Sequence, residues 1–313
     1  MIRENIVVGK DTKYPLKGML TLPEDVSVPV PAVVLVHGSG ATNMDEKVGK
    51  ITPFKDLAEG LARHGIASIR YDKRSHAHGF KMLKDKSQPV TVKAETIDDA
   101  ILATELLRMD ERIDSQNIFI IGHSMGGMLA PRIDVEGGEY RGLILMAGTP
   151  RRLEEVLKEQ MEEALAEMPA FVQKLGAKKA KQFMEKFEGL YDLSDEEAKN
   201  VKMGNGTTLY YFKEMGEPTV AHYLAKSDKP MLIMQGEKDV QVKACKDFEA
   251  YKEILKDKEN VTFKLYEGLN HAFVPSVYGS VSKAKQEYSV EQHIGEDVIA
   301  DIAHWIKLMQ VIV

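Results

Sequence analysis

The chain has 313 residues, of which 43% are hydrophobic, so it is long enough to bury a sizeable core in one elaborated domain. Its 42 basic and 48 acidic residues give a net charge of −6, which leaves no basic surplus for binding nucleic acid or an anionic membrane. Cys245 is the single cysteine, so an intrachain disulfide is excluded and a reducing compartment is favoured.

The start of the chain favours a cytoplasmic protein. Residues 1–5 lack the basic start and the apolar core of a signal peptide. No stretch of the sequence approaches the ~20 consecutive apolar residues that cross a bilayer. We therefore expect a cytoplasmic protein. With the charge balance given above, neither nucleic acid nor a membrane is expected as a partner. The expected partner is a small-molecule substrate, and a homodimer is an open alternative to a monomer.

Strand and helix patterns alternate along the chain. Strand patterns occupy residues 4–9, 16–22, 32–36, 66–70, 118–121, 142–147, 231–235 and 261–266. Helix patterns occupy residues 54–64, 95–109 and 291–309, and an irregular loop is expected between residues 71 and 92. This alternation predicts an α/β fold with a mostly parallel central sheet that is flanked by helices on both faces.

A serine stands between the fifth strand pattern and a helix pattern, in the run Gly122-His123-Ser124-Met125-Gly126. The two glycines lack Cβ atoms, so strand and helix can approach closely and present the hydroxyl at the tip of a tight turn. The helix N-terminus there offers free backbone N–H groups to a developing anion. The pattern predicts that Ser124 is a nucleophile, and the alternative is a structural turn with an inert hydroxyl.

A base and an acid follow downstream in the order that a Ser-Asp-His arrangement requires. Asp239 comes just after the strand pattern at 231–235, and His271 lies in the loop after the strand pattern at 261–266. Alone, Asp239 could be a solvated loop carboxylate and His271 a packed loop histidine. Because both follow successive strands, we predict that they form a catalytic triad with Ser124.

The third strand pattern leads into His37-Gly38-Ser39-Gly40. Acyl transfer needs two backbone donors for an oxyanion, and we predict the N–H groups of Met125 and Ser39 for this task. A phosphate-binding turn is the alternative, but Asn43 stands where the dinucleotide fingerprint has its third glycine. In the segment after residue 70, Asp72 and Arg74 are expected to brace loops near residues 37–40.

The 83 residues from 148 to 230 separate the strand patterns at 142–147 and 231–235, which is far longer than an ordinary connection. Helical stripes near 153–168 and 170–188, and a capping-box pattern at Ser194 and Glu197, predict a helical cap over the active site. The alternative is a solvated helical appendage. We expect Met161, Tyr211 and His222 of this insertion to contact substrate, together with His37 and Gly38.

His76 and His78 alternate in a way that can ligate a metal, but no third ligand accompanies them at a recognisable spacing. A solvated loop or pocket edge is the favoured interpretation of this pair. We expect no metal, and the proposed chemistry requires no organic cofactor.

Four segments carry a resemblance to a known superfamily: residues 37–40, 53–62 and 69–74, and the turn around Ser124 that continues to Pro131 and Arg132. On these residues the chain resembles serine esterases of the α/β-hydrolase superfamily. More narrowly, it is similar to bacterial hydrolases labelled dienelactone-hydrolase-like or prolyl-oligopeptidase-like. Cinnamoyl (feruloyl) esterases look like more distant relatives, which share the serine turn and a helical insertion in the corresponding place.

The resemblance implies an α/β-hydrolase core formed by residues 1–150 and 229–313, with a helical cap at 151–228 inserted after strand 6. It also implies hydrolysis of carboxylic esters of small to medium or aromatic acids through a Ser-His-Asp acyl-enzyme mechanism. A thioesterase, an amidase or peptidase, and an acyltransferase could use the same triad. A non-catalytic ligand-binding protein on a hydrolase scaffold is the alternative of a different class.

Overall fold

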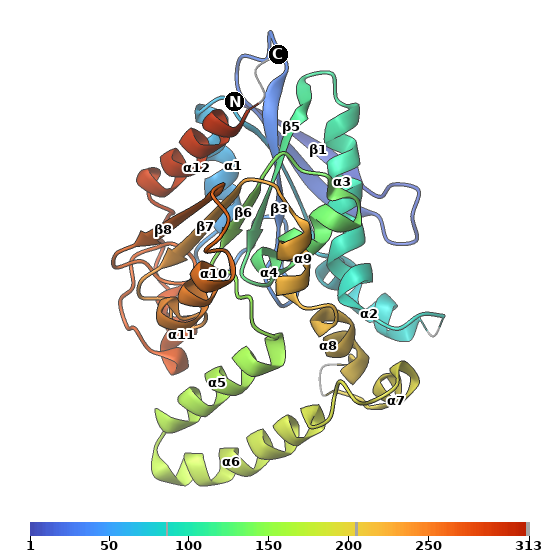
Figure 1. The fold of residues 1–313 in the computed structure, drawn as a ribbon, viewed down its shortest axis with the longest axis vertical. Helices are drawn as coiled ribbons and strands as arrows, with labels where there is room; N and C mark the ends of the chain where they lie inside the picture. Colours follow the sequence, from blue (N-terminus) through green and yellow to red (C-terminus); the bar gives the residue numbers. More distant parts are fainter. Residues whose placement is uncertain (86, 204–205, 311–313) are drawn as a thin grey trace.

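The structure is a computed structural model, and it describes residues 1–85, 87–203 and 206–310 (Figure 1). Its centre is an eight-stranded sheet in the order β1-β2-β4-β3-β5-β6-β7-β8. The first two strands in this order are antiparallel to their neighbours, and all strands from β4 to β8 run parallel. The strands are β1 (Ile2–Val8), β2 (Leu16–Leu22), β3 (Val30–Val36), β4 (Ala67–Tyr71), β5 (Ile113–His123), β6 (Leu143–Met146), β7 (Met231–Gly236) and β8 (Val261–Tyr266).

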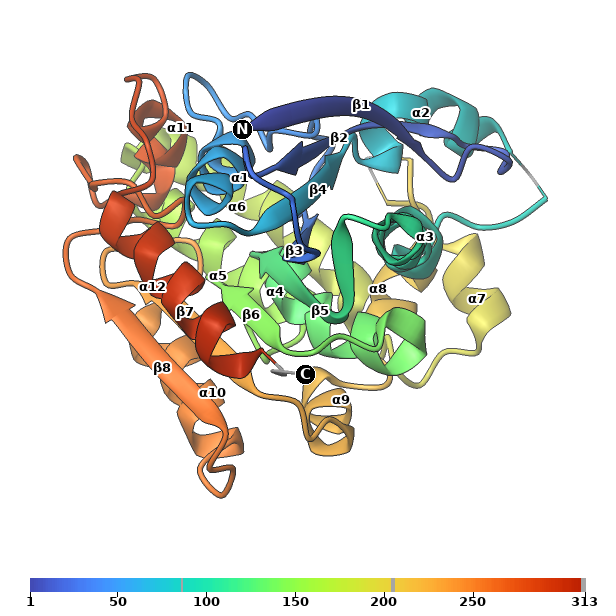
Figure 2. The same ribbon diagram turned by 90° about the horizontal axis from the view of Figure 1, so that it is seen from above.

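Helices cover both faces of this sheet, as Figure 2 shows from above. One face packs against α1 (Pro53–Arg63) and α12 (Glu296–Met309), and the other packs against α3 (Asp98–Met109) and α4 (Met125–Ile133). Every residue of β3 is buried. Val33 and Leu35 belong to the core on the side of α1 and α12, and Val34 and Val36 belong to the core on the side of α3 and α4. A strand that is buried on both faces reads as a continuous apolar run, which is the pattern that predicted it.

Helix α2 was not expected from the sequence. Residues Arg74–Lys84 form α2 in the stretch where an irregular loop was predicted. Only Arg74 and Met82 of this helix are buried, so its sequence has no apolar stripe from which a helix could be inferred. The predicted helix at 95–109 is present as a π-helical turn, Lys93–Ile97, followed by α3.

The insertion between β6 and β7 is helical, as predicted. It consists of α5 (Leu153–Ala166), α6 (Ala170–Met184), α7 (Asp195–Asn200), α8 (Leu209–Gly216) and α9 (Val220–Lys226). The capping box at Ser194 and Glu197 is present at the start of α7. In Figure 1, α5 and α6 form a hairpin that projects beyond the sheet, below the end at which its parallel strands finish.

The last two helices of the insertion pack closely on the core. Helix α9 packs against α4, and Arg132 of α4 forms an ion pair with Glu214 of α8. The Arg132 Nη1 atom also donates to the main-chain oxygen of Glu214 at 3.0 Å. Among the described helices, none is long and apolar enough to span a membrane.

Candidate active site

Ser124 occupies the single residue between β5 and α4. It is the N-cap of α4 and has φ 54° and ψ −116°, a conformation that L-residues rarely adopt. A Cβ on Gly122 would lie 2.1 Å from the Gly126 oxygen, and a Cβ on Gly126 would lie 2.1 Å from the Val36 oxygen. Both glycines are therefore required by the close approach of strand, turn and neighbouring strand.

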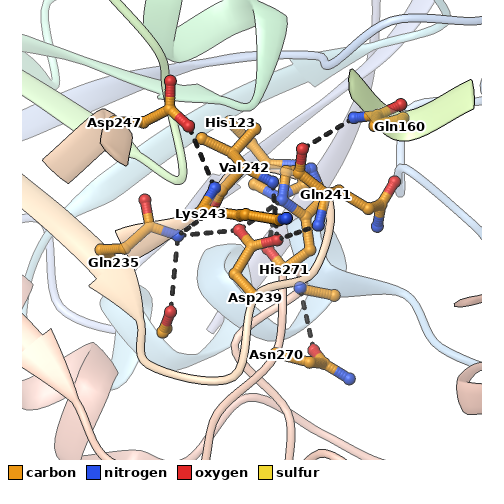
Figure 3. Close-up of polar contacts among 12 residues, drawn as sticks. His123, Gln160, Gln235, Asp239, Gln241, Val242, Lys243, Asp247, Asn270 and His271 are labelled. Atoms are coloured by element: carbon orange, nitrogen blue, oxygen red, sulfur yellow. Dashed lines mark hydrogen bonds and ion pairs between the residues drawn. The ribbon is translucent and has the colours of Figure 1, made fainter. Parts of the chain in front are cut away.

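Asp239 and His271 meet beside this turn. The Nδ1 atom of His271 lies 2.7 Å from Oδ2 of Asp239, and both side chains are buried. The carboxylate also accepts from Gln235 Nε2 at 2.8 Å and from the backbone N–H groups of Gln241 and Val242 at 2.8 and 2.9 Å (Figure 3). With Nδ1 donating to Asp239, the Nε2 atom is the ring nitrogen that can accept a proton.

The loops that carry these two residues are held against each other. Lys238 donates its N–H to the Leu269 oxygen at 2.8 Å, and a Cβ on Gly236 would lie 2.5 Å from the oxygens of Leu269 and Asn270. The Asn270 side chain accepts from the N–H of Ala272 at 3.0 Å, which stabilises the turn around His271. The position of the imidazole is thus set by backbone contacts on both sides of it.

The segment after β3 lies directly next to the serine. A Cβ on Gly38 would be 3.0 Å from the Ser124 Cβ and 3.5 Å from its Oγ. Gly38 donates its N–H to Glu46 Oε1 at 2.7 Å and accepts from Lys73 Nζ at 2.8 Å. Neither Glu46 nor Lys73 was predicted to be a site residue, because no motif in the sequence marks either of them.

Glu46 also contacts the residue before the nucleophile. Its Oε2 lies 2.9 Å from Nδ1 of His123, and Nε2 of His123 donates to the His271 oxygen at 2.9 Å. Burial alone would lower the pKa of His123, but the Glu46 carboxylate and the His271 carbonyl raise it above the ordinary value. Burial alone would raise the pKa of Glu46, but His123 and His37 hold it below the usual range.

Two cavities border this arrangement. One has a volume of about 240 Å³ and is lined by Ser124, His271, His123, Gln241 and Tyr288, among others. The second has a volume of about 450 Å³ and is lined mainly by apolar side chains of α2, α5 and α8, together with Met125. Ser39 lines both cavities, so it stands at the boundary between them.

Two of the five residues predicted to bind substrate line these cavities. Gly38 lines the smaller cavity and Tyr211 the larger one. His37 is instead buried in the core, where its Nε2 lies 3.0 Å from the Asn43 oxygen and burial lowers its pKa to about 4. Met161 lines a separate cavity between α5 and α6, and His222 packs beside the Tyr223 ring on α9.

Two residues after β4, Asp72 and Arg74, were expected to brace loops near residues 37–40, and one of them does so. Asp72 accepts from the N–H of Met44 at 2.8 Å and thereby braces the loop that follows residues 37–40. Arg74 instead forms a buried ion pair with Asp99 of α3, which corrects the expectation that it braces the same loop.

The ring of His78 packs beside Tyr14, and its Nε2 contacts the Pro15 oxygen at 2.8 Å. Within the described part of the chain, no group of three or more His, Cys, Asp or Glu residues could hold a metal ion.

Comparisons with known proteins agree with this architecture. Residues 28–275 match the model of a protein family described as serine aminopeptidase, S33. Esterase EstD of Thermotoga maritima is 34% identical over 291 residues, which cover 93% of this chain and 65% of EstD. The chain therefore spans just under two thirds of the length of that curated relative.

Solved structures of esterases share the fold. The Pyrococcus furiosus esterase Pf2001 aligns with 99% of this chain and 92% of its own, with a TM-score of 0.59 and 17% identity. Est1E from Butyrivibrio proteoclasticus aligns with 97% of this chain and 98% of its own, with a TM-score of 0.57 and 15% identity, and a structure of it has ferulic acid bound. These likenesses confirm the α/β-hydrolase fold that the sequence predicted.

Proposed function

The chain belongs to the serine aminopeptidase S33 family of hydrolases, and from this premise we propose that it is a serine hydrolase that cleaves carboxylic esters of small to medium or aromatic acids. The identity of 34% to Esterase EstD supports ester hydrolysis. The observation that carries the proposal is the 2.7 Å contact of His271 with Asp239 beside a cavity that Ser124 also lines.

The proposed mechanism has two steps. In the first, Nε2 of His271 takes the Ser124 proton as Oγ attacks the ester carbonyl, and the resulting oxyanion accepts from the N–H groups of Met125 and Ser39. The tetrahedral intermediate collapses to the acyl-enzyme, and the alcohol leaves with the proton from His271. In the second, water gives a proton to His271, attacks the acyl carbon, and releases the acid as Ser124 regains its proton. Asp239 holds the imidazole tautomer and stabilises the cation throughout.

The two cavities divide the substrate between them. The leaving oxygen must receive its proton from His271, so the alcohol occupies the 240 Å³ cavity that His271 lines. The acyl group then extends into the 450 Å³ cavity, where Met82, Leu157 and Phe212 provide apolar surface. This volume and lining support an acyl chain of medium length or an aromatic acid, and ferulic acid in the Est1E structure is an acid of the second kind.

The helical insertion acts as a cap in this proposal. Leu153 and Leu157 of α5 and Tyr211 and Phe212 of α8 line the acyl cavity, so the insertion shapes the part of the site that receives the acid. We further propose that the enzyme works in the cytoplasm on a small-molecule ester. Its single cysteine supports this location.

An aminopeptidase is the second candidate, because the family description names one. A free α-amino group is best recognised by a carboxylate that has no other partner. Among the described residues that line the two cavities, Glu46 and Glu95 are the carboxylates. Glu46 already pairs with His123, and Glu95 accepts from Tyr211 and lies 4.0 Å from Lys73, so the ester is favoured.

A substrate panel tests these alternatives. It compares p-nitrophenyl esters from acetate to dodecanoate, methyl ferulate, acyl thioesters, and p-nitroanilides of amino acids with a free or a blocked amino group. We expect the esters to have the highest kcat/KM, and preference for a free aminoacyl anilide would favour the aminopeptidase. Labelling by a fluorophosphonate probe separates an enzyme from a binding protein on the same scaffold, because only an activated serine reacts.

A further inference from the structure

Gly38 is held from both sides by buried charged groups. Glu46 Oε1 accepts from its N–H at 2.7 Å, and Lys73 Nζ donates to its carbonyl at 2.8 Å. Glu46 is 4% exposed and Lys73 is 2% exposed, so bulk water weakens neither contact. Hydrogen bonds to ionised groups are about twice as strong as neutral ones, and this glycine therefore has little freedom to turn.

The bond from Lys73 sets the direction of the next N–H group. The Gly38 carbonyl and the Ser39 N–H belong to one planar trans peptide, in which the two groups point to opposite sides. With the carbonyl turned toward Lys73, the Ser39 N–H is turned away from it. Ser39 lines both cavities beside Ser124, which is the region where the oxyanion forms in the proposed mechanism.

We propose that Lys73 is a positioning residue for transition-state stabilisation, which acts through the Gly38 carbonyl to hold the Ser39 N–H in place, while Glu46 holds the other side of the same glycine. This inference rests on the proposed function, because it assigns a task around the same serine. Neither side chain needs to contact the substrate. Both act by restricting one backbone segment, so that its donor is already oriented when charge develops.

The contacts of Glu46 are those expected of a positioning group. Glu46 has φ 50°, a conformation that costs a non-glycine residue about 1 kcal/mol or more and persists only where the surroundings specify it. Its second oxygen pairs with His123, which in turn donates to the His271 carbonyl. The Glu46 carboxylate thereby connects Gly38, the turn at Ser124 and the loop that carries His271.

Lys73 extends the connection to the insertion. Its Nζ lies 4.0 Å from Oε1 of Glu95, and Oε2 of Glu95 accepts from the Tyr211 hydroxyl at 2.7 Å. Burial lowers the pKa of Lys73, and the charges of Glu95 and Glu46 oppose this effect. Helix α8 is therefore connected to Gly38 through the buried charged side chains of Glu95 and Lys73.

The test compares two lysines that each donate to a backbone carbonyl. Lys73→Met removes the donor to Gly38 and keeps an apolar side chain of similar length. Lys258→Met is the matched control, since it removes a 2.6 Å bond to the Ser227 oxygen, just before β7 begins. For p-nitrophenyl butyrate we expect Lys73→Met to lower kcat about 10²-fold, the lower end of the loss of one oxyanion donor, while KM changes little.

An inhibitor separates positioning from a merely structural role. A trifluoromethyl ketone forms a tetrahedral oxyanion adduct with an active serine, so its Ki should rise by the same factor as kcat/KM falls in Lys73→Met. Lys73→Arg keeps a cationic donor and should recover part of kcat. Should Lys73→Met not fold, Lys73→Gln is measured instead, because its side chain is polar but one atom shorter, and the same losses are expected.

Three results would overturn the inference: wild-type kcat in the folded variant, an equal loss in Lys258→Met, or a lower kcat with unchanged inhibitor affinity. Lack of ester turnover by the wild type would overturn the proposed function and this inference together. Turnover that does not depend on Lys73 would contradict the inference alone.

Discussion

Gln160 of α5 donates a 2.7 Å hydrogen bond from Nε2 to the main-chain oxygen of Gln241, which follows Asp239 by two residues (Figure 3). The first helix of the insertion is therefore tied directly to the loop that carries the acid of the proposed triad. Glu159 on the same helix adds ion pairs with Lys243 and Lys246, which follow that loop, at 3.3 and 2.6 Å. The insertion is attached at one end through α8 and α9 and at the other through these contacts.

The tie at Glu159 should depend on pH. Partial burial would raise the pKa of Glu159, but hydrogen bonds from Lys246, Arg151 and Lys243 lower it to about 2. A lowered folded-state pKa contributes stability above the ordinary value of 4.5, and this stability is lost as the pH falls from there toward 2. We expect Glu159→Gln to be less stable at neutral pH, by at most about 3 kcal/mol, from 1.36 kcal/mol per pKa unit.

Urea unfolding of wild type and Glu159→Gln over a pH series measures this effect. The difference between their free energies of unfolding should shrink steadily below pH ~4.5. Glu162→Gln is the control, because Glu162 is exposed on the same helix. A difference that stays constant down to about pH 2 would show that Glu159 stabilises through packing rather than charge.

Ser124→Ala should abolish turnover without unfolding the protein. The hydroxyl is the proposed nucleophile, so we expect kcat for p-nitrophenyl butyrate to fall by about 10⁴-fold or more and fluorophosphonate labelling to disappear. The Ser124 side chain makes no capping hydrogen bond to α4, so the melting temperature should stay close to that of the wild type. Retained labelling would remove Ser124 from its proposed role.

Asp239→Asn should keep the geometry and lose the activity. Asparagine can donate to the imidazole and so favour the wrong tautomer, and the comparable change in another serine hydrolase lowers kcat about 10⁴-fold. Asp228→Asn is the control, because that carboxylate is fully exposed in the loop before β7. Equal activity of the two variants would mean that another group orients His271.

Replacement by alanine should change the stability in opposite directions at a glycine of the serine turn and at an ordinary helical glycine. Gly126→Ala places a Cβ 2.1 Å from the Val36 oxygen, so we expect a loss of more than about 4 kcal/mol or failure to fold. Gly79 lies in α2 with open space around a Cβ, and Gly79→Ala should stabilise by about 0.5–1 kcal/mol. Thermal unfolding monitored by circular dichroism measures both, and a stable Gly126→Ala protein would contradict the packing described.

Two positions one helical turn apart distinguish the acyl cavity from the cavity between α5 and α6. Leu157 lines the former and Met161 the latter. Leu157→Trp should lower kcat/KM for a p-nitrophenyl octanoate about tenfold, which corresponds to about 1.4 kcal/mol, and leave the acetate ester unaffected. Met161→Trp should leave the whole acyl profile as in the wild type. Loss of long-chain activity in Met161→Trp would instead restore Met161 as a substrate contact.

The contact of His271 with Asp239, beside a cavity that Ser124 also lines, could be predicted because each of the three residues follows a strand of one parallel sheet. The carboxyl ends of such strands lie at the same edge, so sequence position after a strand translates into proximity. The turn at Ser124 could also be predicted, because the close approach of β5 and α4 requires glycine at positions 122 and 126. Both inferences depend on the backbone, whose geometry follows from local pattern.

Glu46, Lys73 and Gln160 could not be predicted in this way. Each acts through a side chain that reaches a segment distant in the sequence or across an irregular loop, and no periodicity encodes such a contact. The same limit explains Met161 and His222, which were assigned to the substrate. A helical stripe shows that a side chain is buried but does not show which neighbour it faces.

The separate linings of the two cavities near Ser124 have a practical consequence. Because they share little besides Ser39, a library at Leu157 and Phe212 would diversify the acid half of the substrate, and a library at Ile51 and Tyr288 would diversify the other half. The two selectivities can thus be evolved one after the other and then recombined as modules.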